Sequence, residues 1–506
     1  MQKFNIKVIR YFLSKHYFGL GTVSIVILAG FFRFWNYGNR WGLAYDQGQF
    51  AVVARYALET VQLPLLGPFS SGGPFQTGGE WYWIVMLGTA LYPKFVLSPW
   101  IFVTLLTIFA VFVMIMVGKI YNGKIFGLLL GFLLALSPVQ IYQSTNLTNQ
   151  TPIVLFSALT ILFALIFTKT GKSKFVFFLA LVVGSATSVH IQSVALMPFI
   201  FFVIVFFRKN ILKNIILISL GLGIPWIPVL IADMQNNFYN TTSMIMYFTN
   251  NQAQVSYDVL GRRWLTFIID FIPTSWGNII GGNIVFGYFF IITATIFAAR
   301  RTLNKKIKKE TLVIFLSIGV MFIILRYVKT PLFESFFVFI HPFIILVSGW
   351  TIFQILKLNR FLGVAVMFII AAGSIYSFWG PINTATNTTY EKVLTIQKVL
   401  YERYPNETFS IYDYQSNNSS IVLPLVLNLY IDDRVGNEGR SIGVYRRTPD
   451  HYIQIEQESL YGDQGALQIF DISSSESSQL EDIGWRNDNP ETVYDETQHW
   501  FRFNTE

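Results

Sequence analysis

The sequence predicts a mainly α-helical protein: a polytopic transmembrane bundle followed by a small soluble domain of α/β or α+β type. Of its 506 residues, 53% are hydrophobic and only 13% are charged, whereas soluble domains carry about 25% charged residues. Residues 1–390 hold 28 Lys and Arg against 8 Asp and Glu, while residues 391–506 hold 9 against 20. We therefore expect residues 1–382 to form a transmembrane domain and residues 383–506 to form a separate soluble domain.

Eleven apolar runs approach the roughly 20 residues that a helix needs to cross a bilayer. They lie near residues 17–36, 99–118, 125–140, 152–168, 174–189, 194–207, 212–231, 284–299, 312–325, 332–353 and 361–380. Connections rich in Lys and Arg separate several of them, at 119–124, 169–174, 208–213, 300–309 and 357–360. Because positively charged loops stay on the cytoplasmic side, these connections and the N-terminus are expected in the cytoplasm of a multi-pass cell-membrane protein.

The run at 81–97 decides the rest of the topology. Eleven spans keep every basic connection in the cytoplasm only if this run does not cross, so we expect a juxtamembrane helix on the outer surface. Counting it as a span is the alternative, which leaves either the basic connections or another run on the wrong side. On the preferred topology the soluble domain is extracytoplasmic. The other outer segments are 37–98, 141–151, 190–193, 232–283 and 326–331.

The composition excludes some kinds of site. The chain has no cysteine, which rules out disulfides and thiolate metal sites. Its five histidines show no HExxH or similar spacing, so we expect no zinc site. A divalent cation is neither indicated nor excluded, and no other cofactor is expected. The net charge of +9 follows the membrane topology, and we expect no nucleic-acid partner.

The soluble domain combines helix and strand signals. Residues 390–404 predict an amphipathic helix, with an apolar stripe formed by Val393, Leu394, Ile396, Val399 and Leu400. Alternating apolar and polar residues predict strands at 408–412, 441–445 and 452–455. This mixture predicts a small α/β or α+β domain.

The stretch from Tyr45 to Trp83 is the most informative part of the chain. It opens on Asp46, continues as a short amphipathic helix at 50–59, and contains a loop rich in Gly, Ser and Pro at 66–79. Such a loop can wrap a polar ligand, because glycine lets backbone N–H groups approach closely and adopts positive φ. Asp46 directly follows the first span and is our candidate general base. The alternative is that outer loops simply tolerate acids.

An aromatic helix start follows this loop. Glu80 precedes Trp81, Tyr82 and Trp83, and it suits either a contact with substrate or the favourable end of a helix dipole. The aromatic residues, with Tyr82 as the substrate-binding candidate, suit stacking on a sugar or an interfacial belt. The belt is the favoured alternative for them.

Cations on the outer side are the remaining candidates. Arg326 and Lys329 lie there against the usual charge bias and suit a lipid phosphate, with Arg making bidentate contacts and Lys acting as a point charge. Snorkelling from a helix end is the alternative. Arg40, with Arg33 before it, is a weaker candidate of the same kind. His190 lies in a short outer turn, where a structural role is favoured over ligand binding.

Several of these features together resemble a family of membrane enzymes. An acid after the first span, the loop LLGPFSSGGPFQTGG with its following aromatics, and the segment SPVQIYQSTNLTNQTPI (137–153) resemble integral-membrane glycosyltransferases of the GT-C fold. The likeness is to family 39, the protein O-mannosyltransferases and the lipid A aminoarabinose transferase. Residues 231–238 and 331–349 also resemble segments of bacterial members, and Asp233 in the former joins the candidates for donor binding.

The resemblance implies both a reaction and some departures from the family pattern. These enzymes take a sugar from a polyprenyl-phosphate donor at the outer face of the membrane and pass it to a lipid, protein or glycan. The carboxylate proposed as their base falls on Asp46. Many members have Asp-Glu where this chain has Asp46 and Gln47, and His-Tyr where it has residues 335–336. The Lys-Pro-Pro of relatives is replaced by residues 77–79, so that phosphate-binding lysine is absent.

The leading hypothesis is a hexosyl- or pentosyltransferase acting at the outer membrane face. Asp46 would deprotonate an acceptor hydroxyl while Arg326 and Lys329 hold the leaving phosphate. The expected partners are a polyprenyl-phosphate sugar, a lipid, glycan or protein acceptor, and membrane lipid. The alternative is a non-catalytic or transport (flippase) protein of cell-envelope glycan assembly. Transporters place ionisable groups at mid-bilayer, whereas these spans are nearly free of charge and the acids gather at one face.

Overall fold

The computed structural model describes most of the chain. The described residues are 6–40, 45–70, 75–207, 210–249, 264–326, 334–384, 390–414, 422–436, 439–446, 459–462, 467–472, 485–487 and 490–498. The helices and the shorter 3-10 or π turns (η) are α1 (Ile6–Phe34), α2 (Tyr37–Arg40), α3 (Tyr45–Glu59), α4 (Glu80–Leu91), α5 (Ser98–Asn122), α6 (Lys124–Ala135), α7 (Pro138–Gln143), α8 (Ile153–Thr170), α9 (Lys174–Val189), η1 (Ile191–Leu196), α10 (Met197–Phe206), α11 (Ile211–Gly223), η2 (Ile224–Trp226), α12 (Ile227–Gln235), α13 (Tyr239–Thr249), η3 (Phe267–Phe271), α15 (Ile272–Ile279), α16 (Ile284–Leu303), α17 (Lys309–Arg326), η4 (Glu334–Ile340), α18 (His341–Leu358), α19 (Arg360–Asn383), α20 (Tyr390–Arg403), α21 (Val422–Ile431) and α23 (Pro490–Gln498). The strands are β1 (Leu66–Phe69), β2 (Gln76–Gly78), β3 (Phe409–Tyr414), β4 (Arg440–Arg446), β5 (Ser459–Gly462), β6 (Leu467–Asp471) and β7 (Trp485–Asn487).

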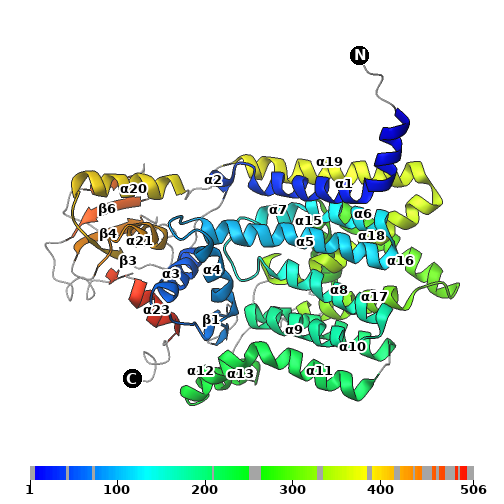
Figure 1. Ribbon diagram of the computed structural model, residues 1–506, viewed down its shortest axis with the longest axis horizontal. Coiled ribbons are helices and arrows are strands. Elements are labelled where there is room, and N and C mark those ends of the chain that lie inside the picture. Colours follow the sequence, from blue (N-terminus) through cyan, green and yellow to red (C-terminus); the bar gives the residue numbers. More distant parts are fainter. Residues whose placement is uncertain are drawn as a thin grey trace.

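Helices form the membrane domain because a helix satisfies its own backbone hydrogen bonds where no water is present. Among the described residues, seven helical segments are long and apolar enough to cross a membrane. They fall in α1, α5, α8, α11–α12, α16, η4–α18 and α19. In Figure 1 the long helices α1, α5 and α19 run along the long axis of the molecule, and the C-terminal sheet with its helices lies at one end.

The helix α18 is the centre of this bundle. It packs against α6, α8, α16 and α19, and 94% of the apolar window of η4–α18 is buried. The outer helices α16 and α19 instead expose large apolar side chains such as Ile292 and Phe368. This distribution is what lipid-facing helices around a protein-facing core require, because lipid replaces water as the solvent of the outer surface.

All eleven apolar runs expected from the sequence are helical, but they are not equally long. Seven are confirmed as candidate spans by their length and apolar character. The runs at 125–140, 174–189 and 194–207 form the shorter helices α6–α7, α9 and η1–α10. The run at 312–325 forms α17, which has 18 residues. For these four runs, crossing of the membrane stays a prediction.

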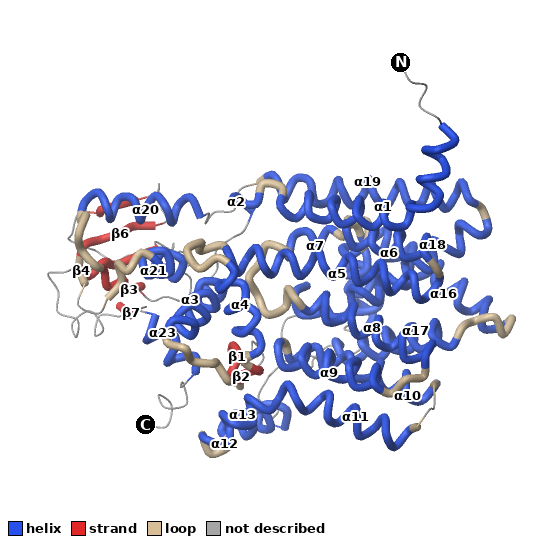
Figure 2. The backbone as a smooth tube through the Cα atoms, viewed as in Figure 1, coloured by secondary structure: helices blue, strands red, loops and turns tan. Residues whose placement is uncertain are grey.

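The helix α4 occupies most of the run that we expected not to cross. It has 12 residues, which at 1.5 Å per residue makes it about 18 Å long, against about 30 Å for the hydrocarbon core. In Figures 1 and 2 it runs across the direction of α5. Its length supports the prediction of a juxtamembrane helix.

The C-terminal region contains a mixed five-stranded sheet in the order β5-β6-β4-β3-β7. The central pair β3 and β4 is parallel, with Ile411 opposite Ile442, and the other pairs are antiparallel. The predicted strands at 408–412 and 441–445 are confirmed by β3 and β4, while the one predicted at 452–455 lies outside the described residues. The predicted helix is α20.

The apolar stripe expected on α20 is only partly buried. Val393, Ile396 and Leu400 are buried, whereas Leu394 is 42% exposed. The buried three are spaced three and four residues apart, so they share one face of the helix. Leu394 lies outside that spacing and faces away from the sheet domain.

The C-terminal region packs against α3, next to the loop at 66–79. The helices α21 and α23 pack against α3, and they lie beside it in Figure 1. Gly48 of α3 lies so close to α21 that an added Cβ would come within 2.6 Å of the Cβ of Leu423. The side-chain amide of Gln498, at the end of α23, bonds both the N–H and the C=O of Leu66 at 3.2 and 2.8 Å. The C-terminal domain therefore helps to position the segment that begins at Asp46.

Candidate active site

The loop at 66–79 forms a hairpin where it is described. The strands β1 and β2 are antiparallel, with Leu66 opposite Gly78. We expected the glycines to supply positive φ, but none of the described glycines of this loop has it. Glycine is required here for close packing instead, because a Cβ on Gly78 would overlap the hydroxyl of Ser188.

The hairpin forms one wall of an open pocket. About 500 Å³ of empty space, continuous with solvent, lies between the hairpin, the start of α3, the segment before α8 and the turn that begins η1. The residues that line it are Asp46, Phe50, Pro68, Phe69, Ser70, Thr77, Thr148, Asn149, Gln150, His190, Ile191 and Gln192. Most of them carry hydroxyl, amide, imidazole or carboxylate groups, which offer hydrogen bonds to a hydroxylated ligand.

Asp46 is the carboxylate of this pocket. It lies in the first turn of α3, and its side chain remains exposed at the opening. The surrounding walls nevertheless raise the pKa of Asp46 above its ordinary value of 3.8, because removal of water disfavours the charged form. An accessible carboxylate that is more basic than an ordinary aspartate fits the predicted role of general base.

Gln47 fixes the chain beside Asp46. Its side chain is buried, and its Oε1 accepts hydrogen bonds from Trp100 Nε1 at 2.9 Å and from the N–H of Leu147 at 3.3 Å. These bonds tie the start of α3 to α5 and to the segment that brings Thr148 into the pocket. Gln47 stands where many members of the resembled family have glutamate. In this structure it is a positioning residue.

Two buried polar atoms at the pocket have no hydrogen-bond partner among the residues that the structure describes. Within the described part of the chain, Nε2 of His190 and Oε1 of Gln192 make no hydrogen bond. The ring of His190 lies 6.1 Å from that of Phe336, and burial lowers the pKa of His190 to about 3. The imidazole is therefore neutral near pH 7. Because unpaired buried polar atoms are costly, these two atoms are suited to a ligand, while the structural role expected for His190 stays a prediction.

The segment Thr148–Gln150 is a part of the site to which we assigned no role from sequence. Asn149 donates a hydrogen bond from Nδ2 to the carbonyl of Val189 at 3.0 Å, which holds this segment against the turn at His190. The available signal was the cluster of hydroxyl and amide residues in an otherwise apolar chain. Without the fold, that cluster cannot be paired with the turn.

Glu80 lies behind the hairpin and does not line the pocket. Its Oε2 accepts a hydrogen bond from Ser188, and its Oε1 is buried with no partner among the described residues. Burial raises the pKa of Glu80 above its ordinary value of 4.5, and the bond from Ser188 offsets part of that rise. A contact with substrate stays a prediction for this residue.

Arg326 ends α17 close to the same region. Its guanidinium lies 5.2 Å from the ring centre of Trp264, and within the described residues its Nε and Nη2 are buried without a hydrogen bond. The helix α17 packs against η1, whose first residues line the pocket. A desolvated guanidinium with unused donors is stabilised by an anion. Lys329, predicted to act with it, lies outside the described residues.

Arg40 has a structural task in this fold. It donates hydrogen bonds to the carbonyls of Phe32 and Arg33 at 2.7 and 2.9 Å and to that of Ile141 at 2.6 Å. These carbonyls belong to the end of α1 and to α7, where Arg40 supplies donors that the helices lack. This geometry gives no support to donor binding by Arg40, which stays a prediction.

Asp233 also caps a helix rather than lining the pocket. Its carboxylate accepts bonds from the N–H groups of Asn240 at 2.8 Å and Thr241 at 2.9 Å, at the start of α13. A carboxylate at a helix N-terminus satisfies orphan donors and complements the dipole. A direct contact with donor therefore has no support in this arrangement.

Two of the three aromatic residues at this helix start belong to the core, whereas Trp83 is partly exposed. Trp81 and Tyr82 are fully buried, and both rings pack edge-on against Phe50 at 5.6 and 6.1 Å. Composition alone cannot separate a belt from a core, because both use the same apolar rings. The ring of Tyr82 has no exposed face, so this arrangement gives no support to substrate binding by Tyr82, which stays a prediction.

Comparisons with known proteins agree with this architecture. The family described as dolichyl-phosphate-mannose-protein mannosyltransferase matches residues 81–231. No curated protein sequence matches the chain. The match covers α4 to α12, and hence two of the segments that line the pocket.

Solved structures resemble most of the chain. ArnT from Cupriavidus metallidurans in the apo state aligns with a TM-score of 0.60 at 12% identity, over 89% of this chain and 98% of that one. The same protein bound to undecaprenyl phosphate gives 0.61 at 13% identity with the same coverage. The Archaeoglobus fulgidus oligosaccharyltransferase tethered with an acceptor peptide that contains the NVT sequon gives 0.53 at 10%, over 86% and 70%. The chain has the GT-C fold of these proteins, which confirms the fold predicted from its sequence.

Proposed function

We propose that this protein is a membrane glycosyltransferase that moves a sugar from a polyprenyl-phosphate donor to an acceptor in the Asp46 pocket. The GT-C fold and the matching mannosyltransferase family support the class of reaction. The similar ArnT structure with bound undecaprenyl phosphate supports a donor carried on a lipid phosphate. The sugar is a hexose or a pentose.

One observation carries the proposal. A carboxylate with a raised pKa, Asp46, shares an open pocket with the unpartnered Nε2 of His190 and Oε1 of Gln192. A pocket that served only the packing of the loop would leave no reason to keep these polar atoms buried and unpaired. A hydroxylated sugar or acceptor that enters the pocket can form hydrogen bonds with these two atoms.

The proposed reaction balances with the groups at hand. Asp46 accepts the proton of the acceptor hydroxyl while the acceptor oxygen forms a bond to the anomeric carbon. The bond between that carbon and the phosphate oxygen breaks, and its electron pair leaves with the lipid phosphate. Arg326 stabilises the charge that develops there, because a fixed cation in a partly dry site costs no reorganisation. Lys329 keeps its proposed role as a second cation for the phosphate.

Replacement of Asp46 tests the proposal directly. We expect Asp46→Asn in the purified full-length protein to lower transfer from radiolabelled polyprenyl-phosphate sugars by about 10²–10⁴-fold, the usual worth of a positioned base. Donor binding should be kept, because the phosphate is held by other groups. The matched control is Asp270→Asn, an exposed acid of the same side whose carboxylate bonds Thr274 at 3.2 Å. Unchanged transfer in Asp46→Asn would refute the assignment.

Arg326→Gln separates binding from chemistry. Arg326 acts on the phosphate both before and during bond breaking, so its loss should weaken donor binding as well as slow transfer. Asp46→Asn should change kcat with little effect on KM for the donor. If both variants bind and transfer like the parent, the pocket and the cation have no part in the reaction.

A further inference from the structure

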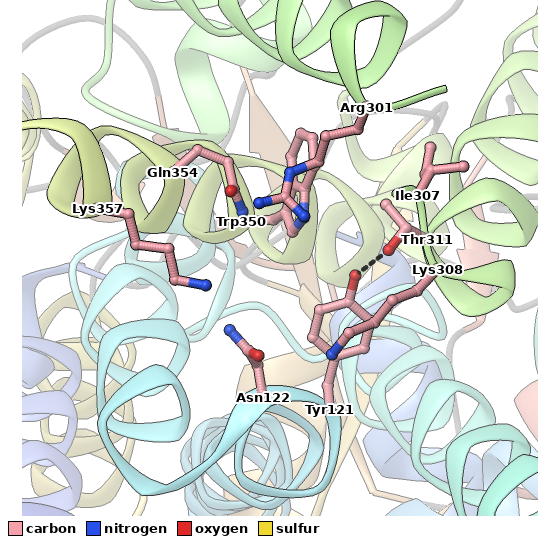
Figure 3. A pocket seen from close by; sticks show the side chains of 9 residues that line it. All are labelled: Tyr121, Asn122, Arg301, Ile307, Lys308, Thr311, Trp350, Gln354 and Lys357. Carbon is pink, nitrogen blue, oxygen red and sulfur yellow. Dashed lines mark hydrogen bonds between the residues drawn. The ribbon is translucent and has the colours of Figure 1, made fainter. Parts of the chain in front are cut away.

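A second polar pocket lies at the other end of the helix bundle. About 330 Å³ of empty space opens between the ends of α5, α16 and α18 and the start of α17. Its lining residues are Tyr121, Asn122, Arg301, Ile307, Lys308, Thr311, Trp350, Gln354 and Lys357. In Figure 3 the charged ends of Arg301, Lys308 and Lys357 point from three sides towards the same opening.

The length of α5 separates this pocket from the Asp46 pocket. Trp100 near the start of α5 bonds Gln47, the neighbour of Asp46, while Tyr121 and Asn122 end the helix. About 20 residues at 1.5 Å each place them roughly 30 Å apart, the thickness of a hydrocarbon core. The two pockets therefore lie at opposite membrane surfaces, and the second one takes no part in the proposed transfer.

The cations of this pocket have no carboxylate partner in the described part of the chain. The nearest acid, Glu310, faces Lys169 at 3.8 Å. Lys308 lies 5.7 Å from the ring centre of Tyr121, and Lys357 lies 4.7 Å from that of Phe353. Each ammonium thus rests on an aromatic ring rather than on an anion. Three converging positive charges repel one another.

Two simpler causes explain part of this cluster but not its geometry. Cations favour helix C-terminal ends, yet each end supplies only about half a charge. Cations also favour cytoplasmic connections, but that bias applies equally to Lys305 and Lys306, which do not line the pocket. The floor of the pocket is polar and fixed, since Tyr121 bonds Thr311 at 2.5 Å and Gln354 is buried.

We propose that this pocket binds the phosphate group of an anionic membrane lipid from the surface opposite Asp46. A phosphate diester offers acceptor oxygens to a guanidinium and to two ammonium groups at once. Basic pockets between transmembrane helices on the cytoplasmic side are suited to anionic headgroups. The bound lipid would hold together the ends of α5, α16 and α18.

The test measures lipid binding by the full-length protein in detergent. Titration with phosphatidylglycerol, followed by native mass spectrometry and by the midpoint of thermal unfolding, should show binding and a higher midpoint than with phosphatidylcholine. Arg301→Gln, Lys308→Gln and Lys357→Gln should each weaken phosphatidylglycerol binding about fivefold. Lys305→Gln and Lys306→Gln are matched controls with the same charge change in the same connection, and they should keep binding within about twofold.

Three results would overturn the proposal. The first is equal phosphatidylglycerol binding by the parent and by Lys357→Gln, whose side chain is exposed, so that folding of this variant is not at risk. The second is an equal loss in the Lys305 and Lys306 controls, which would show diffuse attraction without a site. The third is stabilisation by millimolar inorganic phosphate that the lipid does not match, which would assign the pocket to a soluble phosphate.

Discussion

The hydroxyl of Ser188 donates a hydrogen bond to the carboxylate of Glu80, and this contact joins the end of α9 to the start of α4 directly behind the hairpin. Both groups have room here only because Gly78 has no side chain, since a Cβ on Gly78 would overlap them. Glu80 keeps its second oxygen buried and unpaired among the described residues. The pocket wall therefore packs against a buried carboxylate whose charge depends on pH, because burial raises the pKa of Glu80.

Glu80 should destabilise the protein as pH rises. Its folded pKa lies above the ordinary 4.5 of the unfolded chain, so between these values the folded state binds more protons and stability falls with increasing pH. Glu80→Gln removes this titration and keeps an acceptor for Ser188. We expect its unfolding midpoint to exceed that of the parent at pH 8 and to match it more closely at pH 4.5. A gap that stays constant with pH would contradict the assignment.

Gly78→Ala should push the hairpin away from α9. The new Cβ would overlap the Ser188 hydroxyl and the Glu80 carboxylate, and would lie 3.1 Å from the Cβ of Ser188. We expect a loss of about 1–3 kcal/mol in unfolding free energy, the usual cost of overpacking. The double variant with Ser188→Ala should recover part of it, since the hydroxyl is gone. Strict additivity of the two changes in a double-mutant cycle would disprove the contact.

Asp46 should set the acid limb of the pH–rate profile. A general base must be ionised, so kcat/KM is expected to fall as pH is lowered through the raised pKa of Asp46, above 3.8. His190 is already neutral because burial lowers its pKa to about 3. The same limb should thus persist in His190→Gln at a lower absolute rate. Loss of the limb in His190→Gln would transfer the role of base to the histidine.

We expect the hydrogen bonds of Gln498 to stabilise the contact between α23 and the hairpin strand β1. Gln498→Ala removes both side-chain bonds to Leu66 and should cost about 1–3 kcal/mol, because it leaves buried backbone groups unpaired. Proteolysis of the hairpin should become faster. Glu491→Ala, an exposed change in the first turn of the same helix, serves as the control. Equal protection of the hairpin in both variants would show that the bonds are dispensable.

The helices could be read from the sequence because apolar runs of this length have few other solutions in a membrane. The hairpin could not, since β1 and β2 have four and three residues, too few for an alternating pattern to be recognised. Asp46 could be chosen because acids are rare in the membrane domain. His190 and Gln192 could not, since only the fold shows that their polar atoms are buried without partners.

Contacts at helix ends also could not be predicted from the sequence. Arg40 and Asp233 were chosen as rare charges on the outer side, yet each satisfies backbone groups at helix ends. A charge that caps a helix and a charge that binds a ligand look alike in a sequence, because the cap partner of Arg40 in α7 lies 101 residues away. The sequence gives the functional groups of a side chain directly. Whether those groups are free to bind a ligand depends on contacts with distant parts of the chain.

The bond between Gln498 and Leu66 joins residues that are 432 positions apart, and this separation orders events during biosynthesis. A ribosome that adds 5–20 residues per second needs roughly 20–90 seconds to travel from one to the other. Throughout that interval the loop at 66–79 has been synthesised while its hydrogen-bond partner Gln498 has not. The pocket wall beside Asp46 is complete only after α23 has been synthesised. A nascent or truncated chain therefore inserts into the bilayer before the Asp46 pocket is fully formed.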